Sequence, residues 1–309
     1  MVTVVIKIEE LSKHFGKIKA VDGVNLEIFE GEIFGLLGPN GAGKTTIIRM
    51  LCGLARPSSG KATVGGYDIV RDSVKVRRIV GVVPQSNVLD RELTVKGNLV
   101  YHAKLHGMKK SSYEKSITNV LNLVGMKEKQ DSDPITLSGG MKRRTTIAKA
   151  LVHEPEVLFL DEPTTGLDPQ SKRALWDRIL TLSKKGITMI LTTHYMEEAE
   201  LLCNRIGIID RGKIIALDTP RGLKKMLKGQ AVIEVAHDGT LKPSDLKNCD
   251  FVDELDVKQD NLRIYTKKKK ETASFLFSNY GESILSVDFH EPTLEDVFLH
   301  LTGKELRGE

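Results

Sequence analysis

The sequence predicts an α/β protein with a parallel β-sheet at its core and a smaller α+β domain after it. Continuous apolar runs at residues 33–37, 157–160 and 189–193 are typical of strands buried on both faces of a sheet. Each run leads into a loop, and the repeated order of strand, loop and helix favours parallel strands. We therefore expect the main domain at residues 1–228 and the accessory domain at residues 229–309.

Other local patterns surround this core. Residues 2–8 and 24–28 predict strands, and residues 206–217 predict a hairpin. Between residues 86 and 136 the pattern is helical. Thr94 is placed to cap a helix that runs to residue 106, and Ser112 to cap one that runs to residue 124. We expect this stretch to be an all-helical insertion in the main domain.

The accessory domain follows the order strand, helix, strand, strand, helix, strand, which is typical of a ferredoxin-like fold. A last helix follows it, with Thr293 and Asp296 spaced as a capping box. The expected elements lie at residues 231–236, 244–248, 251–257, 262–266, 271–280 and 283–289.

Composition excludes several classes of protein. Hydrophobic residues make up 40% of the 309 positions and the net charge is +5, but there is no dense basic stripe with aromatic residues, so we expect no nucleic-acid partner. Cys52, Cys203 and Cys249 are far apart, which predicts no disulfide partners, no cysteine zinc site and a reducing compartment. We also expect no signal peptide at the N-terminus and no membrane-spanning helix.

A glycine-rich loop follows the first apolar run directly and reads Gly38-Pro39-Asn40-Gly41-Ala42-Gly43-Lys44-Thr45-Thr46. The glycines let backbone N–H groups approach a phosphate, and the helix that begins there adds its positive end. Lys44 is placed to bridge β- and γ-phosphate oxygens, and the Thr45 hydroxyl to bind Mg²⁺. The loop predicts a nucleoside triphosphate site.

Two acidic residues end the second apolar run. Asp161 stands at the tip of that strand, where a second Mg²⁺ group is expected. Glu162 comes next, and its side chain points differently along an extended chain. We expect Glu162 to polarise the water that attacks the γ-phosphate.

A second anion site is predicted at Ser138-Gly139-Gly140, which we call the signature segment. It begins a helix whose first turns carry Lys142, Arg143 and Arg144, and a glycine-rich helix N-terminus with cations suits an anion. The alternative is an ordinary capped helix. Since the chain already has one complete phosphate loop, the second cradle indicates a nucleotide held by a neighbouring chain.

Five motifs in this order resemble those of the ABC ATPases, from about residue 4 to about residue 218: the phosphate loop, Gln85, Leu137-Ser138-Gly139-Gly140-Met141, Leu160-Asp161-Glu162-Pro163 and His194. The resemblance implies a P-loop NTPase core with an antiparallel β subdomain and a helical insertion, and ATP and Mg²⁺ as cofactors. It also implies a head-to-tail dimer, formed with a second copy or a paralogous subunit. Met141 departs from the Gln common at the end of the signature motif.

The resemblance also assigns roles to single residues. Gln85 is expected to reach Mg²⁺ or the attacking water, and its loop to touch a membrane partner. His194 is expected at the γ-phosphate, with a purely structural histidine as the alternative. Asp168, in Gly166-Leu167-Asp168, is expected to cross the dimer. Phe15 is expected to stack on adenine, with a core phenylalanine as the alternative.

The ending at residues 291–298 is similar to that of daunorubicin-resistance-type exporter ATPases. This similarity implies the ATP-hydrolysing motor subunit of an exporter, held on the inner face of the cell membrane by permease subunits on a separate chain. The alternative is a soluble ABC ATPase of iron–sulfur assembly, translation or DNA repair. A small-molecule kinase would explain neither the signature segment nor His194.

Overall fold

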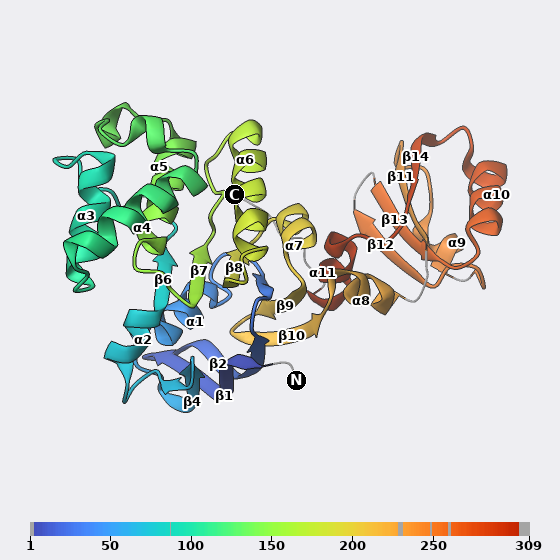
Figure 1. The fold of residues 1–309 in the computed structure, drawn as a ribbon. Coiled ribbons are helices and arrows are strands. Elements are labelled where there is room, and N and C mark those ends of the chain that lie inside the picture. The colour runs from blue at the N-terminus through green and yellow to red at the C-terminus, as the bar shows by residue number, and fades with distance from the viewer. Residues whose placement is uncertain (1–2, 87, 228–230, 248, 259–260, 303–309) are drawn as a thin grey trace. The chain divides into compact units, whose positions relative to one another are not determined.

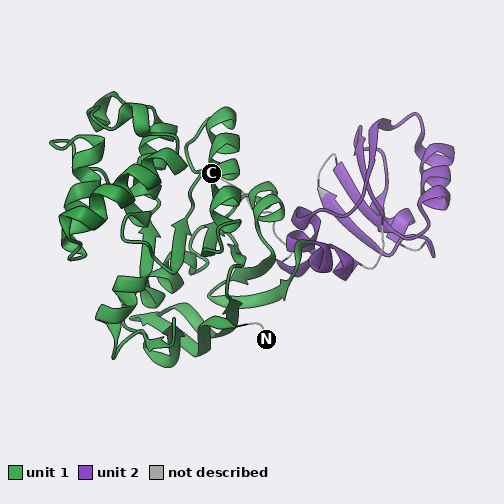
Figure 2. Ribbon diagram, viewed as in Figure 1, with its two compact units in different colours: residues 1–220, 306–309 green, residues 221–305 purple. Residues whose placement is uncertain are grey.

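The computed structural model describes residues 3–86, 88–227, 231–247, 249–258 and 261–302. The chain forms two compact units, one of residues 1–220 with 306–309 and one of residues 221–305 (Figure 2). Each unit has its own sheets and its own core, and each is described by itself. Within the described ranges, none of the helices combines the length and apolar content needed to cross a bilayer.

A six-stranded sheet forms the centre of the first unit. Its order is β10 (Lys213–Asp218), β9 (Arg205–Asp210), β3 (Ile33–Leu37), β8 (Thr188–Thr193), β7 (Val157–Asp161) and β6 (Val80–Val83). The strands from β9 to β6 are parallel, and β10 pairs antiparallel with β9 as the predicted hairpin. Every residue of β3, β7 and β8 is buried, which confirms the prediction from the apolar runs.

The carboxyl ends of β3, β8 and β7 lie side by side, because these parallel strands are neighbours in register. Loops that follow such ends meet at one edge of the sheet. The helices that accompany this sheet are α1 (Lys44–Leu51), α2 (Ser73–Ile79), α6 (Pro169–Ser183) and α7 (Met196–Leu202) (Figure 1). The edge thereby brings together segments that are far apart in the sequence.

A four-stranded antiparallel sheet precedes and flanks this core, as expected. Its order is β2 (Ile18–Phe29), β1 (Val4–Phe15), β4 (Ser59–Val64) and β5 (Tyr67–Asp68). Ile6, Ile8 and Leu11 of β1 are fully or almost fully buried and join one core cluster with Ile47 of α1 and Phe159 of β7. This shared core fixes the antiparallel sheet to the phosphate loop.

The helical insertion consists of α3 (Val95–Leu105), α4 (Lys110–Leu123), η1 (Lys127–Lys129) and η2 (Pro134–Thr136), and α5 (Gly139–Leu151) packs against it (Figure 1). Thr94 caps α3 as predicted, because its Oγ1 accepts from the Gly97 N–H at 3.0 Å. The prediction that Ser112 caps α4 is wrong. The Ser112 N–H already donates to the Lys109 carbonyl, so the helix begins before it.

The second unit has a four-stranded antiparallel sheet in the order β12 (Glu254–Lys258), β13 (Asn261–Thr266), β11 (Ala231–His237) and β14 (Ile284–His290). In chain order this is 2-3-1-4, the ferredoxin-like arrangement that the sequence predicts. Its other elements are α8 (Pro220–Lys224), η3 (Lys225–Leu227), α9 (Pro243–Lys247), α10 (Lys269–Tyr280) and α11 (Leu294–Thr302). The capping box of α11 is confirmed, since Thr293 and Asp296 exchange side chain to backbone hydrogen bonds.

Candidate active site

The phosphate loop joins β3 to α1 and depends on glycine at two positions. A Cβ on Gly38 would lie 2.2 Å from the Ile209 carbonyl oxygen, and one on Gly43 would lie 2.3 Å from that of Ala20. Gly43 also has a φ of +109°, which L side chains rarely adopt. The loop is therefore bare backbone held closely between two neighbouring segments, which is the form that a phosphate cradle requires.

Lys44 begins α1 and is buried, with 4% of its surface exposed. Its Nζ donates to the Gly38 and Pro39 carbonyls at 2.7 and 3.0 Å and forms an ion pair of 3.2 Å with Glu162 Oε1. Burial lowers the pKa of Lys44, and the Glu162 carboxylate opposes that shift. The loop thus holds a positive charge that faces its own carbonyls and one acidic partner.

Thr45 and Asp161 meet across the edge of the sheet. Thr45 Oγ1 donates to Asp161 Oδ2 at 2.9 Å, and Thr192 Oγ1 donates to Asp161 Oδ1 at 2.5 Å. A hydroxyl and a carboxylate are hard oxygen ligands of the kind that Mg²⁺ prefers. This pair of oxygen donors fits a magnesium ion. Thr192, which orients Asp161, could not be singled out in an apolar strand from sequence.

Glu162 gathers three of the predicted residues around one carboxylate. Its Oε2 accepts from Gln85 Nε2 at 3.0 Å and lies 3.4 Å from His194 Nδ1, while its Oε1 pairs with Lys44. The side chain is almost fully buried, and Thr165 Oγ1 also donates to Oε2. Four segments of the chain therefore converge on one acidic group.

The backbone of Glu162 is in the left-handed region, with a φ of +44°. Its N–H donates to the Thr192 carbonyl at 3.1 Å, and this bond to β8 holds the residue in place. Left-handed backbone at a residue other than glycine costs about 1–3 kcal/mol and concentrates at functional sites. This strain could not be predicted from sequence, because Glu162 is not a glycine and nothing beside it signals a left-handed backbone.

A cleft of about 290 Å³ opens between these groups. It is lined by Ala20, Asn40, Gly41, Gly43, Lys44, Thr45, Thr46, Gln85 and Glu162. The structure thus brings the phosphate loop, Gln85 and Glu162 to one cavity. The signature segment does not line it.

The signature segment begins α5, and Ser138 caps the helix by accepting from the Met141 N–H at 3.2 Å. Ser138 and Gly139 are exposed, whereas a Cβ on Gly140 would lie 2.7 Å from Ser171 Oγ. Asp168 lies on the same side, since it caps α6 through the Ser171 N–H at 2.9 Å, and this bonding lowers its pKa. Asp168 and the signature segment therefore share one exposed region beside the start of α6.

Arg143 does not belong to the predicted anion site, and the reason is packing. Its guanidinium is buried and donates to four main-chain carbonyls, of Pro84, Gln85, Asp161 and Pro163. Burial lowers the pKa of Arg143 to about 10, so it stays charged at neutral pH. Arg143 therefore joins α5 to residues 84–85 and to the end of β7.

Arg144 is also turned away from the signature segment. Its Nη1 lies 3.3 Å from the Val124 and Gly125 carbonyls and donates to both. These bonds satisfy the C-terminal end of α4. Only Lys142 of the predicted cationic cluster is left near the helix start without such a role.

Phe15 ends β1 with 55% of its surface exposed, and Lys13 Nζ lies 5.1 Å from its ring centre. The alternative that Phe15 belongs to the core is therefore wrong. An exposed aromatic face remains available for stacking on a flat base.

Comparison with known proteins gives consistent results. Residues 21–165 match the family model described as ABC transporter. The chain is 40% identical over 306 residues to the linearmycin resistance ATP-binding protein LnrL of Bacillus subtilis (strain 168), which covers 97% of this chain and 98% of that protein. It is also 40% identical over 308 residues to the Nod factor export ATP-binding protein I of Rhizobium sp. (strain N33), with 99% of each covered.

Solved structures agree. An ATP-binding subunit of an ABC transporter superposes with a TM-score of 0.66 at 30% identity and covers 73% of this chain and 94% of its own. CbiO1 from Clostridium perfringens, part of the complex cbiONQ, superposes with a TM-score of 0.67 at 30% identity and covers 73% and 93%.

Proposed function

This chain belongs to the ABC transporter family as an ATP-binding protein, and we propose that it is the motor subunit of an exporter. ATP hydrolysis coupled to transport is the activity of the family. The observation that carries the proposal for this chain is the Glu162 carboxylate, which meets Lys44, Gln85 and His194 at the phosphate-loop cleft. Such a buried carboxylate beside a fixed cation suits a general base for water.

The residues divide the hydrolytic work as follows. Main-chain N–H groups between Asn40 and Thr46 and the Lys44 ammonium bind the β- and γ-phosphates. Thr45, Asp161 and Gln85 hold Mg²⁺, which supplies charge neutralisation when it is bound. A γ-phosphate carries more charge than a carboxylate, so it draws Lys44 away from Glu162. The freed carboxylate polarises the attacking water, a contribution of about 10²–10⁴-fold, and His194 contacts the γ-phosphate.

Two chains close head to tail over two ATP molecules in this proposal. The signature segment begins a helix, whose first N–H groups have no partner inside the helix and suit an anion. Since it is exposed and does not line the chain's own cleft, it is suited to the γ-phosphate of the opposing subunit. Asp168, beside it, crosses the same interface. The opposing subunit is a second copy or a paralogous ABC subunit.

Export rests on the relatives, which are named for linearmycin resistance and Nod factor export and match over 97–99% of this chain. The matches extend through the second unit, which is therefore part of the same kind of protein. CbiO1 is part of an ABC transporter complex. By analogy, we propose that a permease on a separate chain holds this protein at the inner face of the membrane.

A second hollow, lined in part by residues that follow Gln85 in the chain, is suited to bind that permease. It has a volume of about 270 Å³ and is lined by Leu89, Arg91, Pro134, Ile135 and Lys142. Ile135 is 61% exposed there, and the cations Arg91 and Lys142 line the same hollow. An apolar anchor with an acidic flank, such as a short cytoplasmic segment of a permease, fits this chemistry. Binding there would act on Gln85 and, through Arg143, on Asp161.

The proposal is tested by two matched pairs of variants. Glu162→Gln should lower kcat for ATP at least about 100-fold, whereas Glu128→Gln, on an exposed turn, should leave it unchanged. In pull-downs from detergent-solubilised native membranes, wild type and Val74→Asp should retain a polytopic membrane protein that Ile135→Asp loses. Full activity of Glu162→Gln contradicts the assigned base, and recovery of only ribosomal, DNA or iron–sulfur partners contradicts transport.

A further inference from the structure

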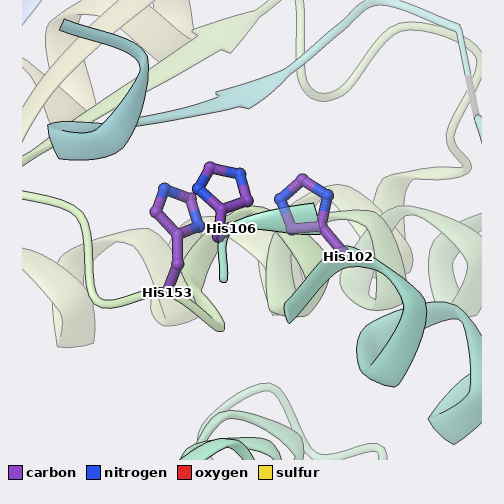
Figure 3. A group of neighbouring side chains, drawn as sticks. All are labelled: His102, His106 and His153. Carbon is purple, nitrogen blue, oxygen red and sulfur yellow. The ribbon is translucent and has the colours of Figure 1, made fainter. Parts of the chain in front are cut away.

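Three histidines lie close together, two at the end of α3 and one after α5 (Figure 3), and none of them lines the phosphate-loop cleft. His102 and His106 stand one turn apart at the C-terminal end of α3, and His153 follows α5. Their rings are close, with centroid distances of 4.7 Å between His102 and His106 and 3.8 Å between His106 and His153. Each offers a ring nitrogen, and these nitrogens lie within 4.8 Å of one another.

His153 shows which of its nitrogens is free. Its Nε2 lies 3.0 Å from the Val80 carbonyl, which can only accept a hydrogen bond, so Nε2 carries the proton. In a neutral ring Nδ1 then has a lone pair, and Nδ1 is buried with no hydrogen-bond partner among the described residues. A carbonyl that accepts from the other ring nitrogen and so fixes the tautomer is typical of metal-binding histidines.

Burial lowers the pKa of all three rings and so favours the neutral form, which is the form that binds metal. Burial lowers the pKa of His153 to about 4 and that of His102 to about 3. The neighbouring histidines and the Lys149 ammonium, which is bonded to the Val88 carbonyl at 2.7 Å, lower the pKa of His102 further. Protons therefore compete weakly for these nitrogens.

We propose that His102, His106 and His153 bind one divalent transition-metal ion, with Zn²⁺ as the best match. Imidazole nitrogens suit zinc, and three protein ligands leave the fourth tetrahedral position to water. Bonds of about 2.0–2.1 Å bring tetrahedral ligand nitrogens to about 3.3 Å from one another. The rings of His106 and His153 are stacked and inclined by 17°, so binding requires them to turn until both lone pairs, which lie in the ring planes, point at one ion.

The bound ion would connect three elements of the first unit. It would tie the end of α3 to the segment after α5, and through the Val80 carbonyl to the first residue of β6. The other end of α5 carries the signature segment. The ion would therefore restrain the helical insertion against the core sheet.

Calorimetric titration of ZnCl₂ into the full chain tests the site. The protein carries no polyhistidine tag, is stripped with EDTA, and is measured without nucleotide or Mg²⁺. Wild type should bind one Zn²⁺ per chain. His102→Gln and His106→Gln should each weaken binding about 100-fold, because the loss of a residue that merely supports a metal ligand already costs about 10–100-fold. His14→Gln, on the exposed end of β1, and Cys249→Ser should bind as wild type does.

Melting temperature and Co²⁺ absorption give independent readouts. Zn²⁺ at a hundredfold excess over its Kd should raise Tm by about 5–10 °C in wild type and in His14→Gln, but not in His106→Gln. Circular dichroism in EDTA verifies that each variant is folded, and Co²⁺ should give a tetrahedral spectrum without a thiolate band. Absence of binding to wild type, or equal binding by His106→Gln and His14→Gln, would overturn the proposal.

Discussion

Replacing Arg143 by Met should be among the most damaging single substitutions outside the ATP cleft. The change keeps an apolar stem but removes every donor to the Pro84, Gln85, Asp161 and Pro163 carbonyls. These carbonyls belong to two segments that carry Gln85 and Glu162, the side chains proposed to act on the attacking water. Without the guanidinium, α5 loses these four bonds to the two segments.

The magnitude follows from burial. A hydrogen bond to a charged group contributes about 1.5–3 kcal/mol, but the bonds are not additive, and removing the guanidinium also removes its own desolvation cost. Breaking a buried charged group's interactions costs about 3–5 kcal/mol in total. For a unit of this size that corresponds to a fall in Tm of about 6–20 °C. We also expect kcat to fall at least about 10-fold, because small displacements of catalytic groups are costly.

Arg144→Met is the matched control, since Arg144 is adjacent and donates only to two carbonyls at the end of α4. It should cost about 1 kcal/mol and leave kcat unchanged. Differential scanning calorimetry and steady-state ATPase assays on the three proteins decide the matter. Equal losses in both variants, or an Arg143→Met protein with the Tm and kcat of wild type, would contradict the structural role of the buried Arg143 guanidinium.

Three further substitutions have defined outcomes. Gly43→Ala should abolish binding of a fluorescent ATP analogue, because its Cβ meets the Ala20 carbonyl oxygen at 2.3 Å and L side chains rarely adopt its φ of +109°; unchanged binding would exclude the close approach. Phe15→Ala should raise the KM for ATP by up to about 10-fold, from a stacking energy of about 0.5–1.5 kcal/mol, and an unchanged KM excludes stacking. The folded-state pKa of His102, about 3, lies below its unfolded value, so unfolding takes up a proton and stability falls as pH drops below about 6.5. Urea unfolding at pH 7 and 5.5 should show His102→Gln losing roughly 1 kcal/mol less than wild type, after allowance for solvent screening; equal losses would contradict the buried neutral ring.

The parts of the fold that sequence could predict are those set by local pattern. The strand Ile33–Leu37 was predictable to the residue because burial on both faces leaves no polar position in it. The glycines of the phosphate loop were predictable because few other functions need that spacing. The cap at Ser112 was predicted wrongly because a serine inside the first turn of a helix cannot be distinguished in sequence from a serine that caps the helix.

The parts that escaped prediction depend on contacts between distant segments. Three consecutive basic residues at a helix start look alike in sequence, and only the carbonyls of Pro84 and Pro163 decide that Arg143 turns inward. His102 and His106 are visibly one turn apart, but His153 joins them only when α5 packs against α3. The left-handed Glu162 likewise needs the Thr192 carbonyl of a neighbouring strand.

The mass of the Glu162→Gln protein tests the proposed head-to-tail dimer most directly. With ATP and Mg²⁺, light scattering after size exclusion should show twice the chain mass of 34.3 kDa. Adding Ser138→Arg should hold the protein at 34.3 kDa, because the side chain blocks the second phosphate cradle, whereas Ser112→Arg on α4 should leave the dimer intact. A mass of 34.3 kDa without the second substitution, or a dimer that survives Ser138→Arg, would contradict the shared nucleotide site.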